Sequence, residues 1–553
     1  MKKIFAIISV FVTMTACSLD EVAFSTINDE DFYENIPQCK AAVNACYRQL
    51  STFNQDMMFV TEGQADLWTS SSTNINMFLA ISPAKPGKAE NCWDNWYKAV
   101  MYANECIYHI ARADLPEEDK MPLVAEARVM RAFSYYMLTC MFDGVPFYTC
   151  PVKTFAVQDS IRALPRTPAE DIREFIYDDI NNNALPWFND SNGLNRRPCD
   201  LKENRAGYAM GLMLMAKAAM WNKEWEKALD ALGKLEDIYG ELSEASYPLE
   251  MTKWQYDNAP ESIFEIFHEW SYTGTQYYGN IAGLMMPRHT GEGIFDGLDM
   301  KDQLGNTLIR MNGIRTNDTF ASFKYDSNTG ELTSTSRKAL FFPLPLKAVY
   351  VDSLGKYGDV VIDAEAISTG VVVYKDQNYR LDRRIPLLFG LGDYKTGRTF
   401  DSVKNGILWA GPRFWCPDMV QNYDSNNYRI FRYADAVLMM AECHAMLGQT
   451  GKAKDYYNMV RRRAGVEESK GFADSDDAMQ YIRAERAREL AGEFQRKFDL
   501  VRWGIWYEQT KTLTDHSTLR SNIRPYHQYY PIPDKQCALS KGALSNPEYS
   551  ASL

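Results

Sequence analysis

The chain has 553 residues and a formal net charge of −12, and aromatic residues make up 13% of it. This charge argues against nucleic-acid binding, because binding to phosphates requires a basic surface. The eleven cysteines include no Cys-x-x-Cys pair, which argues against a zinc ribbon or a thioredoxin-type motif.

The first segment has the pattern of a secretory signal peptide. Lys2 and Lys3 precede the short apolar run Ile4–Met14, and small residues come directly before Cys17. The run is too short to span a bilayer as a helix. Its ending resembles a bacterial lipobox, so residues 1–16 are predicted to be removed and Cys17 to be lipidated. The alternative is ordinary cleavage with a cysteine nearby.

Helical periodicity dominates both ends of the chain. Apolar residues recur at helical spacing in the ranges 36–52, 93–113, 122–142, 167–183, 205–222, 225–239, 430–447, 451–464, 475–492 and 496–510. Thr167 and Pro168 are predicted to cap and begin one of these helices. From 243 to 428 Gly, Pro, Asn and Asp become frequent, and the apolar runs shrink to strand-sized pieces such as "SIFEIFHEW" and "TGVVVYK".

Two helix pairs have the character of tetratricopeptide units. They span the sequences "AMGLMLMAKAAMWNKEWEKALDALGKL" and "ADAVLMMAECHAMLGQTGKAKDYYNMVRRRAG", and the helices at 93–113 and 122–142 add a third pair. Small residues allow paired helices to approach closely, and larger ones fill the space to the next pair. The predicted fold class is therefore mainly α, a tetratricopeptide-like helical scaffold with a loop-rich middle region that contains short strands.

Several motifs resemble those of the SusD/RagB family. Near the C-terminus they are "RYADAVLMMAEC", "RRRAG", "IRAERAREL", "FDLVRWG" and "YYPIPDKQCALSKGALSNPEY"; the N-terminal half adds "WDNWYKAVMYANECI" and "EARVMRAFSYYMLTCMFDGVPF". The resemblance covers nearly the whole chain. The sequence departs from the family pattern at Asp143 and at Ala491-Gly492-Glu493-Phe494.

The resemblance implies one SusD-like domain over residues 17–553. Its parts are predicted to be an N-terminal helical part (17–242), a variable ligand-binding region (243–428) and a C-terminal helical region (429–553). Family members are lipid-anchored proteins of the bacterial outer membrane that capture glycans at the cell surface. They pass them to a SusC-like TonB-dependent transporter and carry no catalysis. The resemblance thus implies a non-enzymatic glycan-binding lipoprotein.

Exposed aromatic rings are the expected means of glycan binding. A pyranose ring has apolar C–H faces that an indole or phenol ring can cover at low entropy cost. The stretch "EWSYTGTQYY" supplies Trp270, Tyr272, Tyr277 and Tyr278, and it is interpreted as a loop. A second segment, "TEGQADLWTSSSTNINMF", supplies Trp68. Trp68 and Trp270 are predicted to be the platforms.

Hydrogen bonds to the sugar hydroxyls are assigned to Asp66, Asn76 and Arg288. Burial of the aromatic residues in the core remains the competing interpretation. No cofactor is expected and no metal site is assigned, although a structural Ca²⁺ is left open because some relatives hold one.

Two other functions stay open. A peptide-capturing lid of a RagB-like uptake system is the main alternative. A glycoside hydrolase would require two carboxylates across a bond, and Glu265 and Glu269 lie near the aromatic stretch. The sequence contains no Gly-x-Ser-x-Gly, no His-Glu-x-x-His and no P-loop, which disfavours an enzyme.

Overall fold

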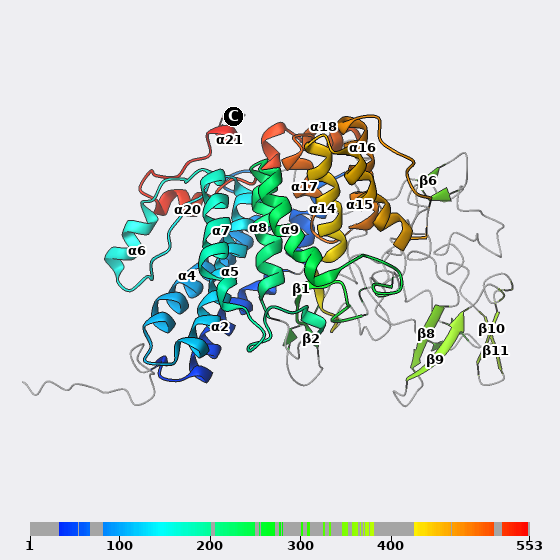
Figure 1. Ribbon diagram of the computed structural model, residues 1–553, viewed down its shortest axis with the longest axis horizontal. Helices are drawn as coiled ribbons and strands as arrows, with labels where there is room; N and C mark the ends of the chain where they lie inside the picture. The colour runs from blue at the N-terminus through cyan, green and yellow to red at the C-terminus, as the bar shows by residue number, and fades with distance from the viewer. Residues whose placement is uncertain are drawn as a thin grey trace, which may run out of the picture.

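The structure is a computed structural model that describes the two helical ends of the chain and short pieces of the middle (Figure 1). The described residues are 32–53, 55–66, 81–200, 205–248, 256–270, 425–465, 467–490, 492–513 and 522–550, with single residues and short strands between 251 and 380. The described part is mainly helical, as predicted. The division into 17–242, 243–428 and 429–553 stays a prediction, and Cys17 lies outside the described residues.

Three central helices form the interior. They are α5 (Glu117–Phe142), α8 (Tyr208–Trp221) and α14 (Tyr433–Met446), and nearly every residue of each is buried. Helices that are buried all round need neighbours on every side. These neighbours include α4 (Lys88–Arg112), α7 (Ala169–Asn183), α9 (Trp225–Tyr239), α15 (Thr450–Arg463) and α16 (Ser475–Glu489), which pack against the central helices (Figure 1).

The predicted helix pairs are confirmed. Helix α4 packs on α5, α8 on α9 and α14 on α15, and the contact of α9 with α14 joins the α8–α9 pair to the α14–α15 pair. The small residues of these pairs, Ala216, Ala228, Ala441 and Ala453, are completely buried. Their size allows the paired helices to approach closely. The scaffold is therefore a row of stacked helix pairs.

Several predicted boundaries were wrong. Thr167 is not the N-cap of α7, because Pro168 occupies that position while Thr167 forms a backbone bridge with Val145. Residues 428–432 form strand β12 (Tyr428–Arg432) before α14 begins, although the apolar pattern predicts a helix from 430. The range 496–510 contains two helices, α17 (Arg496–Arg502) and α18 (Trp506–Leu513), separated near Gly504, whose φ is 71°.

The strand-sized runs form strands as expected. "SIFEI" is β1 (Ser262–Ile266), which pairs antiparallel with β12. Both strands are buried along their whole length, so this pair belongs to the core. "VVVY" is β10 (Val371–Tyr374), paired with β11 (Gln377–Arg380). A second hairpin joins β8 (Leu346–Val351) to β9 (Tyr357–Ile362).

The C-terminal region closes over the N-terminal helices. The Tyr530 hydroxyl donates to the carbonyl of Val60 at 3.0 Å, and the Tyr530 amide donates to the carbonyl of Met141 at 2.8 Å. The Asp534 amide donates to the carbonyl of Pro83 at 2.9 Å. Among the helices that the structure describes, none combines the length and apolar character required to cross a bilayer.

Candidate ligand-binding surface and its support

The aromatic stretch 269–278 begins directly after the buried strand β1. Its backbone forms a short antiparallel ribbon of β2 (Glu269–Trp270) and β3 (Gln276–Tyr277), with Glu269 opposite Tyr277 and Trp270 opposite Gln276. The interpretation of these residues as a loop was therefore incomplete. The ribbon follows a strand that is fixed in the core, so its base has a defined position.

Most of the predicted site residues lie outside the described part of the chain. Trp68, Tyr272, Asn76, Tyr278 and Arg288 fall there, and Trp270 and Tyr277 are described only as backbone. Their roles in ligand binding stay predictions.

Asp66 is the one predicted hydrogen-bonding residue whose side chain is described, and it differs from the prediction. Its carboxylate is fully buried and accepts hydrogen bonds from Nε and Nη2 of Arg496, each at 2.7 Å. Both oxygens are thus engaged by one guanidinium, a strong bidentate arrangement. Asp66 fixes the base of the segment that leads to Trp68 and does not reach a ligand in this arrangement.

The segment before Asp66 is fixed in the same way. The indole nitrogen of Trp506 donates to the carbonyl of Gln64 at 2.7 Å, and the Arg496 amide donates to Glu62 at 3.4 Å. Glu62 and Gln64 are completely buried. Residues from the end of the chain therefore position the start of the Trp68 segment.

Residues 492–496, here called the support segment, connect both predicted ligand-binding segments. Arg496 binds Asp66, as described above. The side-chain amide of Gln495 donates from Nε2 to the carbonyl of Ile430 in β12 at 3.4 Å. Because β12 pairs with β1, the support segment is joined to the strand that leads into the Trp270 ribbon.

Phe494 lies at the centre of the support segment, with its backbone in the left-handed region at φ 63°. Its ring contacts Phe53, Trp254 and Tyr428, with centroid separations of 5.3, 6.3 and 6.4 Å. A bulky residue keeps such a backbone conformation only when its surroundings compensate for the strain. Phe494, where the sequence departs from the family pattern, is thus part of a packed junction between the two halves of the fold.

His268 continues this junction between β1 and β2. Its ring centroid lies 3.9 Å from that of Tyr428, and its backbone amide donates to the Asn427 side chain at 3.2 Å. Burial lowers the pKa of His268 to about 4, so its imidazole is neutral near pH 7.

Glu265 does not have the freedom of a catalytic acid. One oxygen accepts from Nε of Arg429 at 3.3 Å, and the other accepts from Asn427 at 3.2 Å and from the Asn258 amide at 2.9 Å. The residue is 2% exposed. Its carboxylate is committed to joining β1 to β12 and the preceding turn, whereas Glu269 is exposed.

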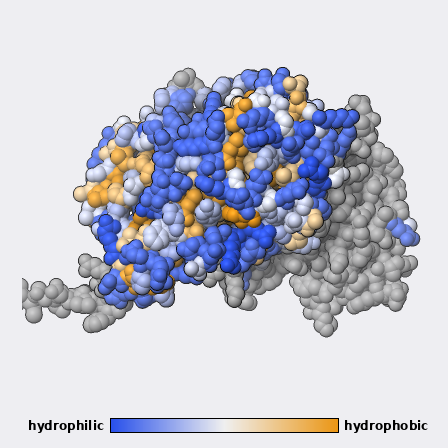
Figure 2. Space-filling view, in the orientation of Figure 1, coloured by the Kyte–Doolittle hydropathy of each residue, from blue (hydrophilic) through white to orange (hydrophobic). Residues whose placement is uncertain are grey.

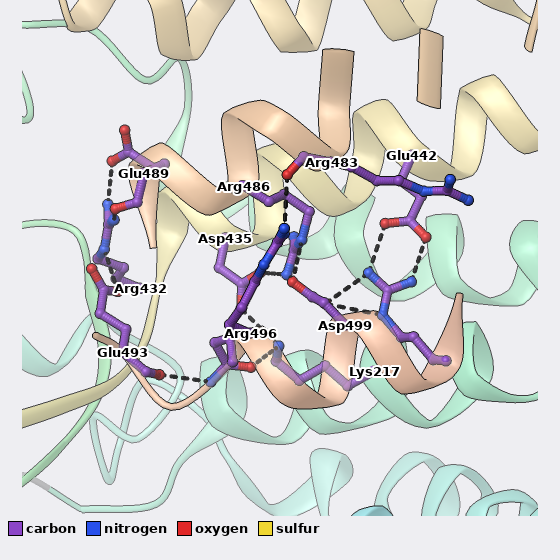
Figure 3. A network of polar contacts seen from close by, with 12 residues as sticks. Lys217, Arg432, Asp435, Glu442, Arg483, Arg486, Glu489, Glu493, Arg496 and Asp499 are labelled. Carbon is purple, nitrogen blue, oxygen red and sulfur yellow. Dashed lines mark hydrogen bonds and ion pairs between the residues drawn. The ribbon is translucent and has the colours of Figure 1, made fainter. Parts of the chain in front are cut away.

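An ion-pair network supports the same junction from the side of the helices (Figure 3). The Asp435 carboxylate lies between Lys217 and Arg486, at 2.7 and 2.8 Å. Arg486 also binds Asp499 through two hydrogen bonds, at 2.8 and 3.1 Å. Burial alone would raise the pKa of Asp435, but these two cations hold it well below its ordinary value.

A second centre of the network lies at the end of β12 (Figure 3). Arg432 donates to Glu493 at 2.7 Å, to Glu489 at 2.7 Å and to Glu261 at 3.1 Å. Arg463, the last residue of α15, forms ion pairs with Glu261 and Glu489. Of the three arginines at 461–463, Arg463 thus takes part in the buried ion-pair network. Sequence reasoning missed this network, and its only signal was the density of Arg and Glu near positions 483–499.

No cluster of three or more His, Cys, Asp or Glu side chains suited to a metal ion occurs in the described part of the chain. The prediction about Ca²⁺ therefore stays a prediction.

Comparisons with known proteins place these features in context. The model of the SusD family matches residues 419–549, and a family model described as "Starch-binding associating with outer membrane" matches residues 20–175. The chain is similar to SusD-like protein P25 of Formosa agariphila, with 25% identity covering 93% of this chain and 92% of that protein.

Solved structures share the fold. A SusD-like protein of Bacteroides fragilis has a TM-score of 0.63 at 18% identity, covering 93% of this chain and 97% of that one. Surface glycan-binding protein A of Bacteroides thetaiotaomicron, in complex with laminarihexaose, has a TM-score of 0.55 at 20% identity, covering 92% and 98%. A laminarin-binding SusD-like protein has a TM-score of 0.57 at 19% identity, covering 92% and 98%.

Proposed function

Because the chain belongs to the SusD/RagB family, we propose that it captures oligosaccharides or polysaccharides at the cell surface and delivers them to a SusC-like TonB-dependent transporter. The observation that carries the proposal is the junction of the two predicted ligand-binding segments. The aromatic ribbon leaves the core at β1, and the Trp68 segment leaves it at Asp66. Both are joined through residues 492–496.

The support segment suits a binding surface that must be rigid. Stacking on a sugar is most favourable when the ring is held in place before the ligand arrives, because less side-chain entropy is lost. In this proposal Trp68 and Trp270 are the stacking platforms, with Tyr272, Tyr277 and Tyr278 supporting them. Asn76 and Arg288 bind hydroxyl groups, and Asp66 acts as a positioning residue beneath the surface.

The protein acts at the outer membrane without catalysis of its own. The family description that refers to outer-membrane association supports this location. Lipidation of Cys17 provides the attachment, since each buried methylene of an acyl chain contributes about 0.8 kcal/mol. The engagement of Glu265 by three donors supports a binding role rather than glycoside hydrolysis.

Replacement of Trp270 tests the proposal. Trp270→Ala is expected to weaken binding to a laminarin-type glucan, or to whichever glycan of a panel the protein binds, at least tenfold in affinity electrophoresis and calorimetry. Its melting temperature is expected to stay within about 2 °C of the parent, because the proposal places this ring at the surface, where it adds little to folding. Tyr481→Ala is the control, since Tyr481 is an aromatic residue on α16 that is 47% exposed.

Three outcomes contradict the proposal. A large fall in melting temperature with intact binding assigns Trp270 to the core. Release of reducing sugar from the panel makes the protein an enzyme. Binding of oligopeptides in a parallel series, with no glycan bound, replaces the glycan proposal with the peptide-capturing lid.

A further inference from the structure

A cleft lies at one edge of the described scaffold, and no residue of β1 lines it. Helices α4, α6 (Phe155–Arg162) and α20 (Asp534–Leu539) border it, and its volume is about 340 Å³. Figure 1 shows these three helices together at one edge of the molecule, and Figure 2 shows hydrophobic residues gathered over that edge. The volume is in the range of pockets that hold small ligands.

The cleft stays open because α6 is not packed into the core. The structure assigns no buried residue to α6, and Phe155 at its start is 88% exposed. A second hollow of about 450 Å³ lies on another side of the same helix, and Tyr148 and Ile161 line both. Helix α6 therefore forms a wall between two hollows.

Fixed aromatic rings line the inner side of the cleft. Tyr97 and Tyr148 are nearly parallel, at an interplanar angle of 4° and a centroid distance of 6.4 Å, and Trp93 lies 4.9 Å from Tyr97. The Tyr97 hydroxyl donates to the carbonyl of Pro146 at 2.7 Å, and the Tyr148 amide donates to the hydroxyl of Tyr135 at 2.9 Å. These rings offer a rigid apolar surface of the kind that covers a sugar face.

The groups at the mouth of the cleft favour an anion. Lys98 on α4 is exposed and makes no hydrogen bond or ion pair with another described residue. Arg162 on α6 has one exposed ion pair, 3.5 Å from Asp159, and such a pair is weak.

The carboxylates near the cleft already have partners within the protein. Asp94 accepts from Gln536 at 3.1 Å and lies 3.7 Å from Lys535, and Asp159 lies 3.5 Å from Lys541. Two cations on facing walls thus remain for a ligand, in a chain whose net charge is −12.

We propose that this cleft is a second saccharide site, selective for a short oligosaccharide that carries carboxylate or sulfate groups. The sugar ring rests on Tyr97 and Tyr148, and its anionic group lies between Lys98 and Arg162. The ligand class rests on the proposed function, whereas the site itself is separate from the Trp270 ribbon. A chain with both sites holds one acidic polysaccharide at two points, which raises its overall affinity through effective concentration.

Calorimetry on the purified full chain with trigalacturonate tests the site, with maltotriose as the neutral probe and sulfate as the simple anion. Lys98→Glu with Arg162→Glu is expected to weaken trigalacturonate binding at least tenfold, and Leu539→Trp is expected to do the same by filling the cleft. Both alter exposed positions, so folding is preserved. Lys452→Glu with Lys454→Glu on α15 is the matched control, because it makes the same charge change away from the cleft.

The outcomes separate this proposal from the proposed function. Retention of trigalacturonate binding in Trp270→Ala, together with its loss in the two cleft variants, supports the second site even if no neutral glycan binds the ribbon. The proposal is overturned if the parent protein does not bind trigalacturonate, if sulfate binds equally well, or if the cleft variants bind like the control. Loss of binding in Trp270→Ala alone assigns the acidic glycan to the ribbon and also overturns it.

Discussion

At the scale of single residues, the contact between Asp66 and Arg496 shows how a residue predicted to bind a ligand serves the fold instead. Both charges are buried, and their sequence separation of 430 residues joins the two ends of the chain. The position of Asp66 beside Trp68 in the sequence suggested a ligand contact. Sequence spacing alone does not reveal an arginine that approaches from so far along the chain.

Removal of the Asp66 carboxylate should therefore lower stability strongly. Asp66→Ala leaves the Arg496 guanidinium buried without its partner, and the free energy of unfolding is expected to fall by about 3–5 kcal/mol. Urea unfolding measures this loss. Asp230→Ala is the control, because Asp230 pairs with Lys234 on the surface of α9, where such a pair contributes less than about 1 kcal/mol. Equal losses in the two variants would refute the structural role given to Asp66.

At the scale of elements, two glycines with open space around them have opposite conformational roles. Gly233 lies inside helix α9, and a Cβ there would meet nothing within 4 Å. Gly504 lies between α17 and α18 at φ 71°, and a Cβ there would also meet nothing within 4 Å. Contacts are thus absent at both positions, and only the backbone conformation differs.

Alanine at these positions should change stability in opposite directions. Gly233→Ala is expected to raise the free energy of unfolding by up to about 1 kcal/mol, because alanine favours the helix. Gly504→Ala is expected to lower it by about 1–2 kcal/mol, because a Cβ disfavours the left-handed conformation. Chemical denaturation of the two variants side by side gives the comparison. A stabilised Gly504→Ala would show that α17 and α18 can join into one helix.

The sequence predicted elements well where burial follows a helical period, as in α4 and α9. It failed where the period is not the deciding factor. The apolar run that begins at Tyr428 is compatible with helix and strand, and pairing with β1 decides for a strand. Helix α6 went unnoticed because its eight residues are too few for a helical period to stand out in the sequence. The support segment at 492–496 was visible only as a departure from a family pattern, because its contacts come from distant parts of the chain.

At the scale of the whole molecule, two buried histidines link stability to pH. Burial lowers the pKa of His268 and of His527 to about 4, below the value of about 6.5 in an unfolded chain. Well above pH 6.5 neither state binds the extra proton. As the pH falls from 6.5 towards 4, the unfolded chain takes up protons that the folded protein does not, so the free energy of unfolding decreases.

The expected loss over this interval is at most about 3 kcal/mol for each histidine. Urea unfolding at pH 7.0, 6.0, 5.0 and 4.5 measures the slope. His268→Gln removes one titrating group, and its slope should be smaller than that of the parent by about one proton. A His268→Gln variant with the same slope as the parent would contradict the burial of a neutral His268.

The contacts of Trp506 and Tyr530 with Val60, Gln64 and Met141 have a consequence for biosynthesis. A ribosome makes the N-terminal helices first, and the surfaces around Gln64 and Val60 that later receive Trp506 and Tyr530 stay uncovered until more than 400 further residues have been added. Loops of that length close slowly. The nascent chain therefore carries uncovered apolar surface until Trp506 and Tyr530 have been made, and a premature stop codon before Trp506 yields a product that cannot complete its interior.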